Sequence, residues 1–324
     1  MKTTRRMWSA VACGAAAAWA SGCRRDTKKR VAVIPKGTSH IFWLTVEAGS
    51  LAAGREFGLE ILWNGPPAET DYSRQIQIFD SYVAQRVDGI VIAASDRKAL
   101  VGPIDRAMAS GIPVTVFDSG LDSTNYLSYV ATDNKEAGRM GAREMGRLLD
   151  GKGQIGLVQH LPGSVSTTDR EEGFTELIAK EFPGIRIVAR QYGMSDRSKS
   201  MAAAENILTA HPDLNGFFCS TEPSATGTAL AVKSRGEAGK VKIVAFDSNE
   251  TMIADLRDGV IQAMVVQDPF KIGYEAVKTI QTKLSGGTPP KRMDLEGRVV
   301  TLANLDRPEI QKLLNPDLKR YLGA

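Results

Sequence analysis

Short apolar runs rich in β-branched residues alternate with longer stretches of helical periodicity in the first part of the chain. Each run has the length of a strand, and its continuous apolar character is typical of a parallel strand buried on both faces. We predict strands over residues 31–35, 59–63, 89–93 and 113–119, helices over about 42–57 and 98–110, and a helix after an N-cap at Thr70. This alternation predicts a doubly wound α/β unit.

The same alternation returns in the second part of the chain. A strand over 126–131 leads out of the first half. We then predict helices over 134–149, 168–180, 197–210, one ending near 234, and 269–284, with strands over 154–159, 185–191, 216–219, 242–246, 261–267 and 299–302 and a helical tail over 307–322. No low-complexity linker separates the halves, so we expect several short chain crossings that form a hinge.

Two strands end in the same three residues, Phe-Asp-Ser. The first copy places Asp118 at the carboxyl end of its strand, and the second places Asp247 there. In open α/β sheets ligands bind outside the carboxyl ends of the strands. The two carboxylates are therefore predicted to line one cleft between the halves, the alternative being that each caps the helix that follows.

The N-terminus reads as an export signal. Basic residues precede an apolar run that is too short to span a membrane, and small residues then lead to Cys23. The segment Ala20-Ser-Gly-Cys23 resembles a bacterial lipobox, so we predict a lipoprotein signal over 1–22, lipidation of Cys23 and a basic tether over 23–30. A plain secretory signal cut near residue 22 is the alternative.

The charge of the chain argues against a nucleic-acid partner. Without residues 1–22 the formal charge falls from +4 to +1, and residues 23–30 alone carry +4, so the remainder carries −3. The basic tether suits an anionic lipid surface. Cys219 ends an apolar run and is predicted to be a buried core residue.

The motifs give little support to catalysis. Residues 151–156 match G-x-G-x-x-G, but the match follows a helix and precedes a strand, which is the wrong context for dinucleotide binding. The histidines lack metal-ligand spacing, so neither a metal nor another cofactor is predicted.

Aromatic and charged residues lie near the predicted cleft. Phe42 and Trp43 follow the first strand and suit stacking on a sugar ring, or simply pack the first helix on its sheet. Lys36, at the end of that strand, is either a ligand donor or a solvated lysine. Gln267 lies where the chain crosses back to the first half.

From residue 31 to about 302 the chain resembles the periplasmic sugar-binding proteins of ABC importers of the ribose-binding type. The matching segments include residues 31–43, 88–92, 112–118, 131–134, 170–174, 210–213, 244–247 and 266–267. The resemblance implies an α/β fold of two Rossmann-like lobes with parallel sheets and a three-crossing hinge, the type I periplasmic binding protein fold. The lobes are predicted to comprise residues 31–132 with 268–295, and 133–267 with 296–324.

The resemblance also implies a set of ligand-binding residues. They are Lys36, His40, Phe42, Trp43, Asp118, Thr168, Ser195, Thr221, Phe246, Asp247 and Gln267. Asp133, Asp169 and Arg170 are further candidates that lie at predicted helix starts, where a carboxylate also serves as an ordinary cap. Thr168, Ser195 and Thr221 replace larger residues of the ribose pattern. Lys36 and Asp169 are similar to the branch that binds autoinducer-2 and rhamnose.

The sequence thus predicts an exported, lipid-anchored monomer that captures a monosaccharide or similar polyol and delivers it to an ABC permease. An autoinducer-2 or rhamnose receptor and a chemosensory sugar receptor that contacts a chemoreceptor remain alternatives. A sugar-responsive repressor would need a helix-turn-helix before residue 31, and a sugar enzyme would use Asp118 and Asp247 as an acid/base pair.

Overall fold

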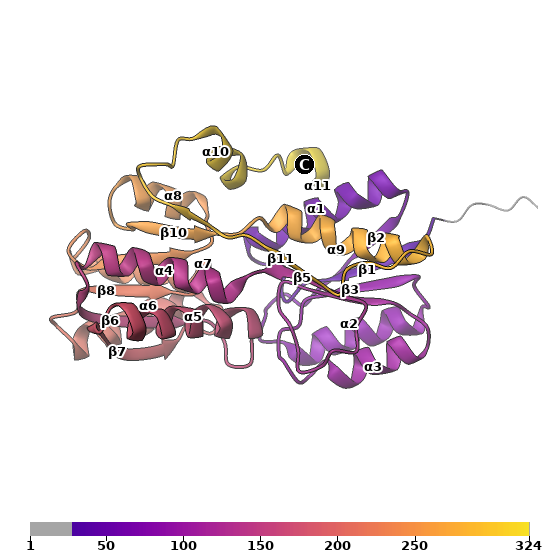
Figure 1. Cartoon of the computed structure of the whole chain (residues 1–324), viewed down its shortest axis with the longest axis horizontal. Helices are drawn as coiled ribbons and strands as arrows, with labels where there is room; N and C mark the ends of the chain where they lie inside the picture. Colours follow the sequence, from indigo (N-terminus) through magenta and orange to yellow (C-terminus); the bar gives the residue numbers. More distant parts are fainter. Residues whose placement is uncertain (1–27, 324) are drawn as a thin grey trace, which may run out of the picture.

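The computed structural model describes residues 28–323, which form two lobes that each contain a six-stranded sheet (Figure 1). The first sheet has the strand order β11-β5-β4-β3-β1-β2, and all of its pairs are parallel. Its elements are β1 (Arg30–Ile34), α1 (Ile41–Phe57), β2 (Glu60–Trp63), α2 (Tyr72–Ala84), β3 (Gly89–Ile92), α3 (Val101–Ala109), β4 (Val114–Phe117), β5 (Ser128–Thr132), α9 (Pro269–Leu284) and β11 (Arg292–Leu295).

The second sheet has the order β12-β10-β9-β8-β6-β7, and its pairs are parallel except the one between β10 and β12. Its elements are α4 (Asn134–Leu148), β6 (Lys152–Gln159), α5 (Val165–Glu181), β7 (Gly184–Tyr192), α6 (Arg197–Ala210), β8 (Gly216–Cys219), α7 (Glu222–Ser234), β9 (Lys242–Phe246), α8 (Glu250–Arg257), β10 (Ala263–Val266), β12 (Arg298–Val300) and α10 (Pro308–Leu314).

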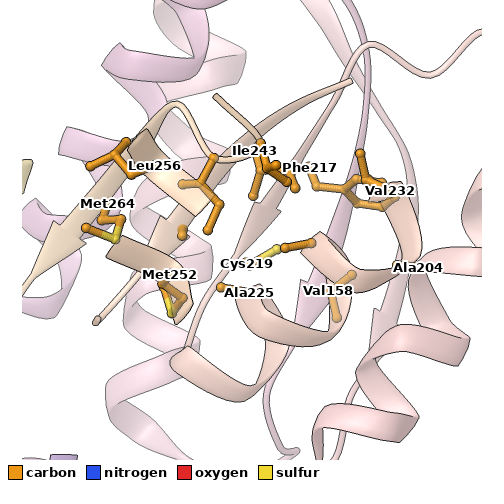
Figure 2. Close-up of a cluster of buried hydrophobic side chains, with 14 of the residues drawn as sticks. Val158, Ala204, Phe217, Cys219, Ala225, Val232, Ile243, Met252, Leu256 and Met264 are labelled. Carbon is orange, nitrogen blue, oxygen red and sulfur yellow. The ribbon is translucent and has the colours of Figure 1, made fainter. Parts of the chain in front are cut away.

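Helices cover both faces of each sheet, as the apolar strand pattern requires. In the first lobe α2 and α3 pack on one face and α1 and α9 on the other (Figure 1). In the second lobe α4 and α5 cover one face, and α6, α7 and α8 cover the other. Figure 2 shows part of that second core, where Cys219 of β8 lies among Val158, Ala225 and Met252. The predicted α/β class with two parallel-sheet lobes is confirmed, and Cys219 is a core residue.

In each lobe, two helices on one face of the sheet pack closely where a glycine of one helix meets the backbone of the other. A Cβ atom at Gly49 of α1 would lie 2.0 Å from the carbonyl oxygen of Phe270 in α9. A Cβ atom at Gly138 of α4 would lie 2.0 Å from the carbonyl oxygen of Arg170 in α5. Only glycine permits these approaches, and the second one fixes the backbone of a predicted site residue.

The chain passes between the lobes at three internal points, from β5 to α4, from β10 to α9 and from β11 to β12. Thr132, which ends β5, donates its hydroxyl hydrogen bond to Gln267 Oε1 at 2.8 Å and joins two of these crossings. Hinges of this kind absorb lobe motion in a few residues at element ends.

The C-terminal tail departs from its predicted place in the second lobe. Helix α10 packs on the core of that lobe through Ile310, but α11 (Lys319–Leu322) lies against α1 of the first lobe. The guanidinium of Arg55 donates to the carbonyl oxygens of Arg320 and Tyr321 at 2.9 and 2.8 Å, and the Tyr321 ring packs on Phe270. The tail therefore makes a fourth passage between the lobes.

Several element bounds differ from the sequence-based prediction. The N-cap of α2 is Asp71 and not Thr70, because the Asp71 carboxylate accepts from the backbone N–H of Arg74 at 2.9 Å. Helix α5 begins at Val165, three residues before the predicted start. Two short elements, α8 and β11, were not predicted.

The signal, the lipidation site at Cys23 and most of the basic tether lie outside the described residues. Within residues 28–323, no helix combines the length and the apolar character that a membrane crossing needs.

Candidate ligand-binding site between the lobes

Asp118 and Asp247 occupy equivalent positions in the two lobes. Both have left-handed backbone conformations, with φ of 55° and 66°. Each donates its backbone N–H to the neighbouring strand, Asp118 to Val130 O and Asp247 to Val265 O, and both distances are 2.9 Å. The duplicated Phe-Asp-Ser sequence therefore builds the same turn twice, and each turn aims a carboxylate at the cleft.

Neither carboxylate caps the helix that follows it in the chain, although Asp247 Oδ2 accepts from the backbone N–H of Glu222, the first residue of α7, at 3.3 Å. The helix after Asp247 is capped by Asn249, whose side chain accepts from the backbone N–H of Met252 at 2.7 Å. Asp118 is followed by a loop and by strand β5. The capping alternative is wrong for both residues.

Each carboxylate faces a buried cation. Lys36 Nζ lies 3.3 Å from Asp118 Oδ2, and both side chains are buried. Arg170 Nη1 lies 3.9 Å from Asp247 Oδ2, and Gln267 Nε2 donates to Asp247 Oδ1 at 2.7 Å. Burial raises the pKa of Asp247, although the charge of Arg170 and the Gln267 hydrogen bond oppose that shift.

Arg170 is fixed in place by the second lobe. Its guanidinium lies 3.9 Å above the centre of the Phe246 ring, donates to Asn134 Oδ1 at 2.8 Å and donates to Ser220 O at 3.0 Å. Phe246 thus lies behind Arg170 and supports it.

The aromatic residues of α1 combine core packing with a place beside the cleft. Trp43 is buried, its ring meets Phe42 edge-on at 4.9 Å between centroids, and its Nε1 donates to Glu69 Oε1 at 2.9 Å. Both rings line the cavity between the lobes.

Polar contacts cross directly from one lobe to the other. Glu69 Oε2 of the first lobe lies 2.9 Å from His160 Nε2 of the second. Lys36 Nζ donates to Ser164 Oγ at 3.1 Å and to Ser166 Oγ at 3.0 Å. These contacts define a closed arrangement of the lobes.

The cavity between the lobes is small. Its volume of about 40 Å³ leaves room for only a few water molecules. It is lined by Lys36, His40, Phe42, Trp43, Glu69, Asp118, His160, Ser166, Thr167, Arg170, Thr221, Glu222, Pro223, Asp247 and Gln267. A ligand larger than a few waters must therefore part the lobes and displace some of the direct contacts.

Five of the predicted site residues do not line this cavity. Phe246 supports Arg170, and Ser195 Oγ lies 3.2 Å from His40 Nε2 at the cleft edge. Asp133 caps α4, since its carboxylate accepts from the backbone N–H of Glu136 at 3.0 Å. Asp169 is outside the lining, and burial raises its pKa.

Thr168 lies at a separate surface depression with Gln159, Glu171 and Arg190. Because α5 begins at Val165, Ser166 and Thr167 face the cavity instead. Residue 151 ends the turn after α4 and residues 152–156 begin strand β6, so the G-x-G-x-x-G match lies before a strand, as predicted, which is the wrong context for a dinucleotide site. Across residues 28–323, no group of three His, Cys, Asp or Glu residues could hold a metal ion.

The periplasmic binding protein domain matches residues 31–288 of the chain. The chain belongs to the periplasmic binding protein family. Its two-lobe fold and its cleft between the carboxyl ends of two parallel sheets follow from that membership, and so does a location outside the cytoplasm.

Known proteins resemble this periplasmic binding protein over most of its length. It is 30% identical over 275 residues to the D-ribose/D-allose-binding protein of Pseudomonas aeruginosa, which covers 82% of this chain and 86% of that protein. A solute-binding protein from Agrobacterium radiobacter in complex with D-arabinose has a TM-score of 0.86 and 31% identity, covering 89% of this chain and 99% of that chain. A solute-binding protein from Agrobacterium vitis bound with alpha-D-tagatopyranose has a TM-score of 0.85 and 30% identity, with the same coverages.

The site of this periplasmic binding protein includes residues that the sequence did not single out. They are Glu69, His160, Ser166, Thr167, Glu222 and Pro223. His160 directly follows β6, and Glu69 follows β2 within a proline-containing loop. Their positions after the ends of strands could have indicated a place at the ligand cleft.

Proposed function

We propose that this periplasmic binding protein captures a monosaccharide or similar small polyol between its lobes and delivers it to the permease of an ABC transporter. The observation that carries the proposal is the twin placement of Asp118 and Asp247 at equivalent strand ends of the two lobes. Relatives whose names state D-ribose and D-allose, and similar structures that contain D-arabinose or tagatose, support a sugar as the ligand.

In this mechanism the ligand replaces direct contacts between the lobes. Its hydroxyl groups donate to Asp118 on one lobe and to Asp247 on the other, while Lys36 and Arg170 donate to its oxygens. The Phe42 and Trp43 rings contact its carbon face. The ligand stabilises the closed form over the open form by the difference between its binding free energies to the two forms.

The finer parts of the proposal concern export, anchoring and partners. We propose that residues 1–22 are removed as a lipoprotein signal and that Cys23, acylated as the new N-terminus, holds a monomer at the membrane. The permease binds the closed form, and a chemoreceptor partner would bind the same form. Mass spectrometry of the membrane fraction tests the anchor, because a diacylglycerol-modified N-terminal cysteine is expected and a mature chain without it contradicts the proposal.

A binding role without catalysis is part of the proposal. The cavity pairs its carboxylates with cations and amides that orient a ligand. Two hydroxyl groups contact histidines at the cleft, Thr221 Oγ1 with His160 Nδ1 at 3.3 Å and Ser195 Oγ with His40 Nε2 at 3.2 Å, so catalysis is tested directly. Recovery of an unchanged sugar after prolonged incubation is expected, and turnover would favour an enzyme.

Thermal shift with a sugar panel tests the function. The panel contains D-ribose, D-allose, D-arabinose, D-tagatose, L-rhamnose and an autoinducer-2-like diol. A ligand that binds only the folded chain raises its apparent stability by RT ln(1 + [L]/Kd), so a tight ligand is visible at modest concentration. A shift with one of the sugars is expected. Response to the diol or to L-rhamnose alone would favour the receptor alternative.

A further inference from the structure

The carboxylate of Glu222, the first residue of α7, is held from one side only. Its Oε1 atom accepts from Arg197 Nη2 at 2.7 Å, from Thr226 Oγ1 at 3.0 Å and from Asn249 Nδ2. These three donors come from α6, α7 and the residue that caps α8. The side chain is 2% exposed, and its orientation is therefore fixed before any ligand arrives.

The second oxygen of this carboxylate accepts no hydrogen bond. Oε2 is buried, no described residue donates to it, and His40 Nδ1 lies 3.5 Å away across the cleft. Buried acceptors are nearly always satisfied, because an unmet one costs free energy. Glu222 lines the cavity, so a bound molecule is positioned to supply the missing donor.

Thr228 Oγ1 is the other unpartnered buried side-chain atom within residues 28–323. It is a neutral hydroxyl in α7 that lies near Cys219 in the core, away from the cavity lining. The unmet charged acceptor of the described chain is thus at the cavity.

We propose that Glu222 is a ligand-recognition residue that accepts a hydrogen bond from a hydroxyl group of the ligand, and that the ligand is a neutral sugar and not an acidic one. This inference rests on the proposed function. Glu222 joins Asp118 and Asp247 as a third buried carboxylate, so the ligand must present donors on three sides.

The charges around the cavity exclude an acidic group. Among the described lining residues, Lys36 already faces Asp118 and Arg170 already faces Asp247. His160 faces Glu69, which is a fourth carboxylate of the lining, and His40 faces Glu222. A carboxylate or phosphate on the ligand would meet buried negative charge without a free cation to balance it.

Isothermal titration calorimetry of the purified full chain tests the inference. The probes are D-ribose, D-allose, D-arabinose and D-tagatose, together with D-glucuronate and D-galacturonate. The test variant is Glu222→Gln, which keeps the shape of the side chain but presents a donor where an acceptor is needed. The matched control is Asp255→Asn, a buried carboxylate of α8 that pairs with Lys233 outside the cavity.

For the best neutral sugar, Glu222→Gln is expected to raise Kd roughly tenfold to a hundredfold, the loss of one hydrogen bond to a charged group. Asp255→Asn is expected to leave Kd within about twofold, since contacts at a distance from the ligand add little. A third variant, Asn249→Ala, loosens the carboxylate without removing it and is expected to raise Kd by a smaller factor. It also keeps the test decisive if Glu222→Gln does not fold.

The outcomes separate the inference from the function on which it rests. If the wild-type chain binds a neutral sugar and Glu222→Gln binds it equally well, the inference is overturned while the proposed function stands. Tighter wild-type binding of a uronate than of every neutral sugar overturns the inference as well. If no sugar binds the wild-type chain, the proposed function fails and the inference fails with it.

Discussion

Glu69 and His160 form a hydrogen bond, 2.9 Å between Oε2 and Nε2, that joins the two lobes across the cleft. Burial alone would raise the pKa of Glu69, but His160, with Lys36 and His40 behind it, lowers that pKa well below its ordinary value of 4.5. A depressed carboxyl pKa means that the ionised form stabilises the closed arrangement. That stabilisation is complete above the ordinary pKa and is lost as the pH falls towards the depressed value.

We therefore expect the ligand-free protein to open as the pH falls below about 4.5. Small-angle scattering should show a rising radius of gyration while circular dichroism still reports a folded chain. Glu69→Gln should already be more open at pH 7. Glu136→Gln is the control, because Arg143 and Arg139 also lower the pKa of Glu136 outside the cleft. Equal scattering of Glu69→Gln and wild type at pH 7 would contradict the expectation.

Asp247 should show opposite effects on stability and on binding. Its pKa is raised by burial, so its ionised form destabilises the ligand-free protein. Asp247→Asn is expected to keep or raise the melting temperature. The same variant should raise the Kd for a sugar roughly tenfold or more, because a charged acceptor is lost. A melting temperature well below wild type, with unchanged Kd, would refute this account.

Asp118→Asn provides the comparison in the other lobe. It leaves Lys36 without its carboxylate partner at 3.3 Å, and both groups are buried. Truncating one member of a buried charged pair costs about 2–5 kcal/mol of binding free energy. We expect Asp118→Asn to weaken sugar binding and to lower the melting temperature, as measured by calorimetry and thermal denaturation.

Gly138 couples helix packing to the site. An alanine there would place its Cβ 2.0 Å from the carbonyl oxygen of Arg170 and push α4 and α5 apart. Gly138→Ala is expected to cost about 1–3 kcal/mol of stability and to weaken sugar binding through Arg170. Gly102→Ala in α3 is the control, since its nearest neighbour is the flexible Arg106 side chain at 3.5 Å. That control should be neutral or slightly stabilising in denaturant unfolding.

Cys219 should be chemically inert in the folded chain. Burial raises the pKa of its thiol to about 12, and the residue has no exposed surface. In a variant with Cys13 and Cys23 changed to Ser, Ellman's reagent should react only after unfolding. Rapid reaction of the native protein would show that the core of the second lobe around Cys219 opens locally.

Local sequence signals predicted those parts of the site that depend on one lobe. The repeated Phe-Asp-Ser placed Asp118 and Asp247 at strand ends because the same turn recurs in each lobe. The family resemblance assigned Thr168 to the ligand, whereas in this structure the neighbouring Ser166 and Thr167, in the first turn of α5, line the cavity. The predicted lobe boundaries stay a prediction, apart from the tail.

Local sequence patterns did not predict the contacts between the lobes. Glu69 and His160 are 91 residues apart and meet only because two separately folded units close on each other. Likewise, Arg197 and Asn249, which orient Glu222, lie 25 and 27 residues from it in the chain, and only Thr226, four residues later in α7, is a local partner.

The fourth passage of the chain, from α10 to α11, links the two lobes at a place away from the ligand cavity. Arg55 holds α11 on the first lobe, while α10 stays with the second lobe. A truncation after Asn315 removes this link, and it is expected to raise Kd for a sugar a few-fold by favouring open forms. An unchanged Kd would show that α11 follows either lobe freely. By this account, residues 316–323 contribute to the affinity of a cavity that they do not line. A substitution there would then change sugar uptake while every side chain of the cavity stays the same.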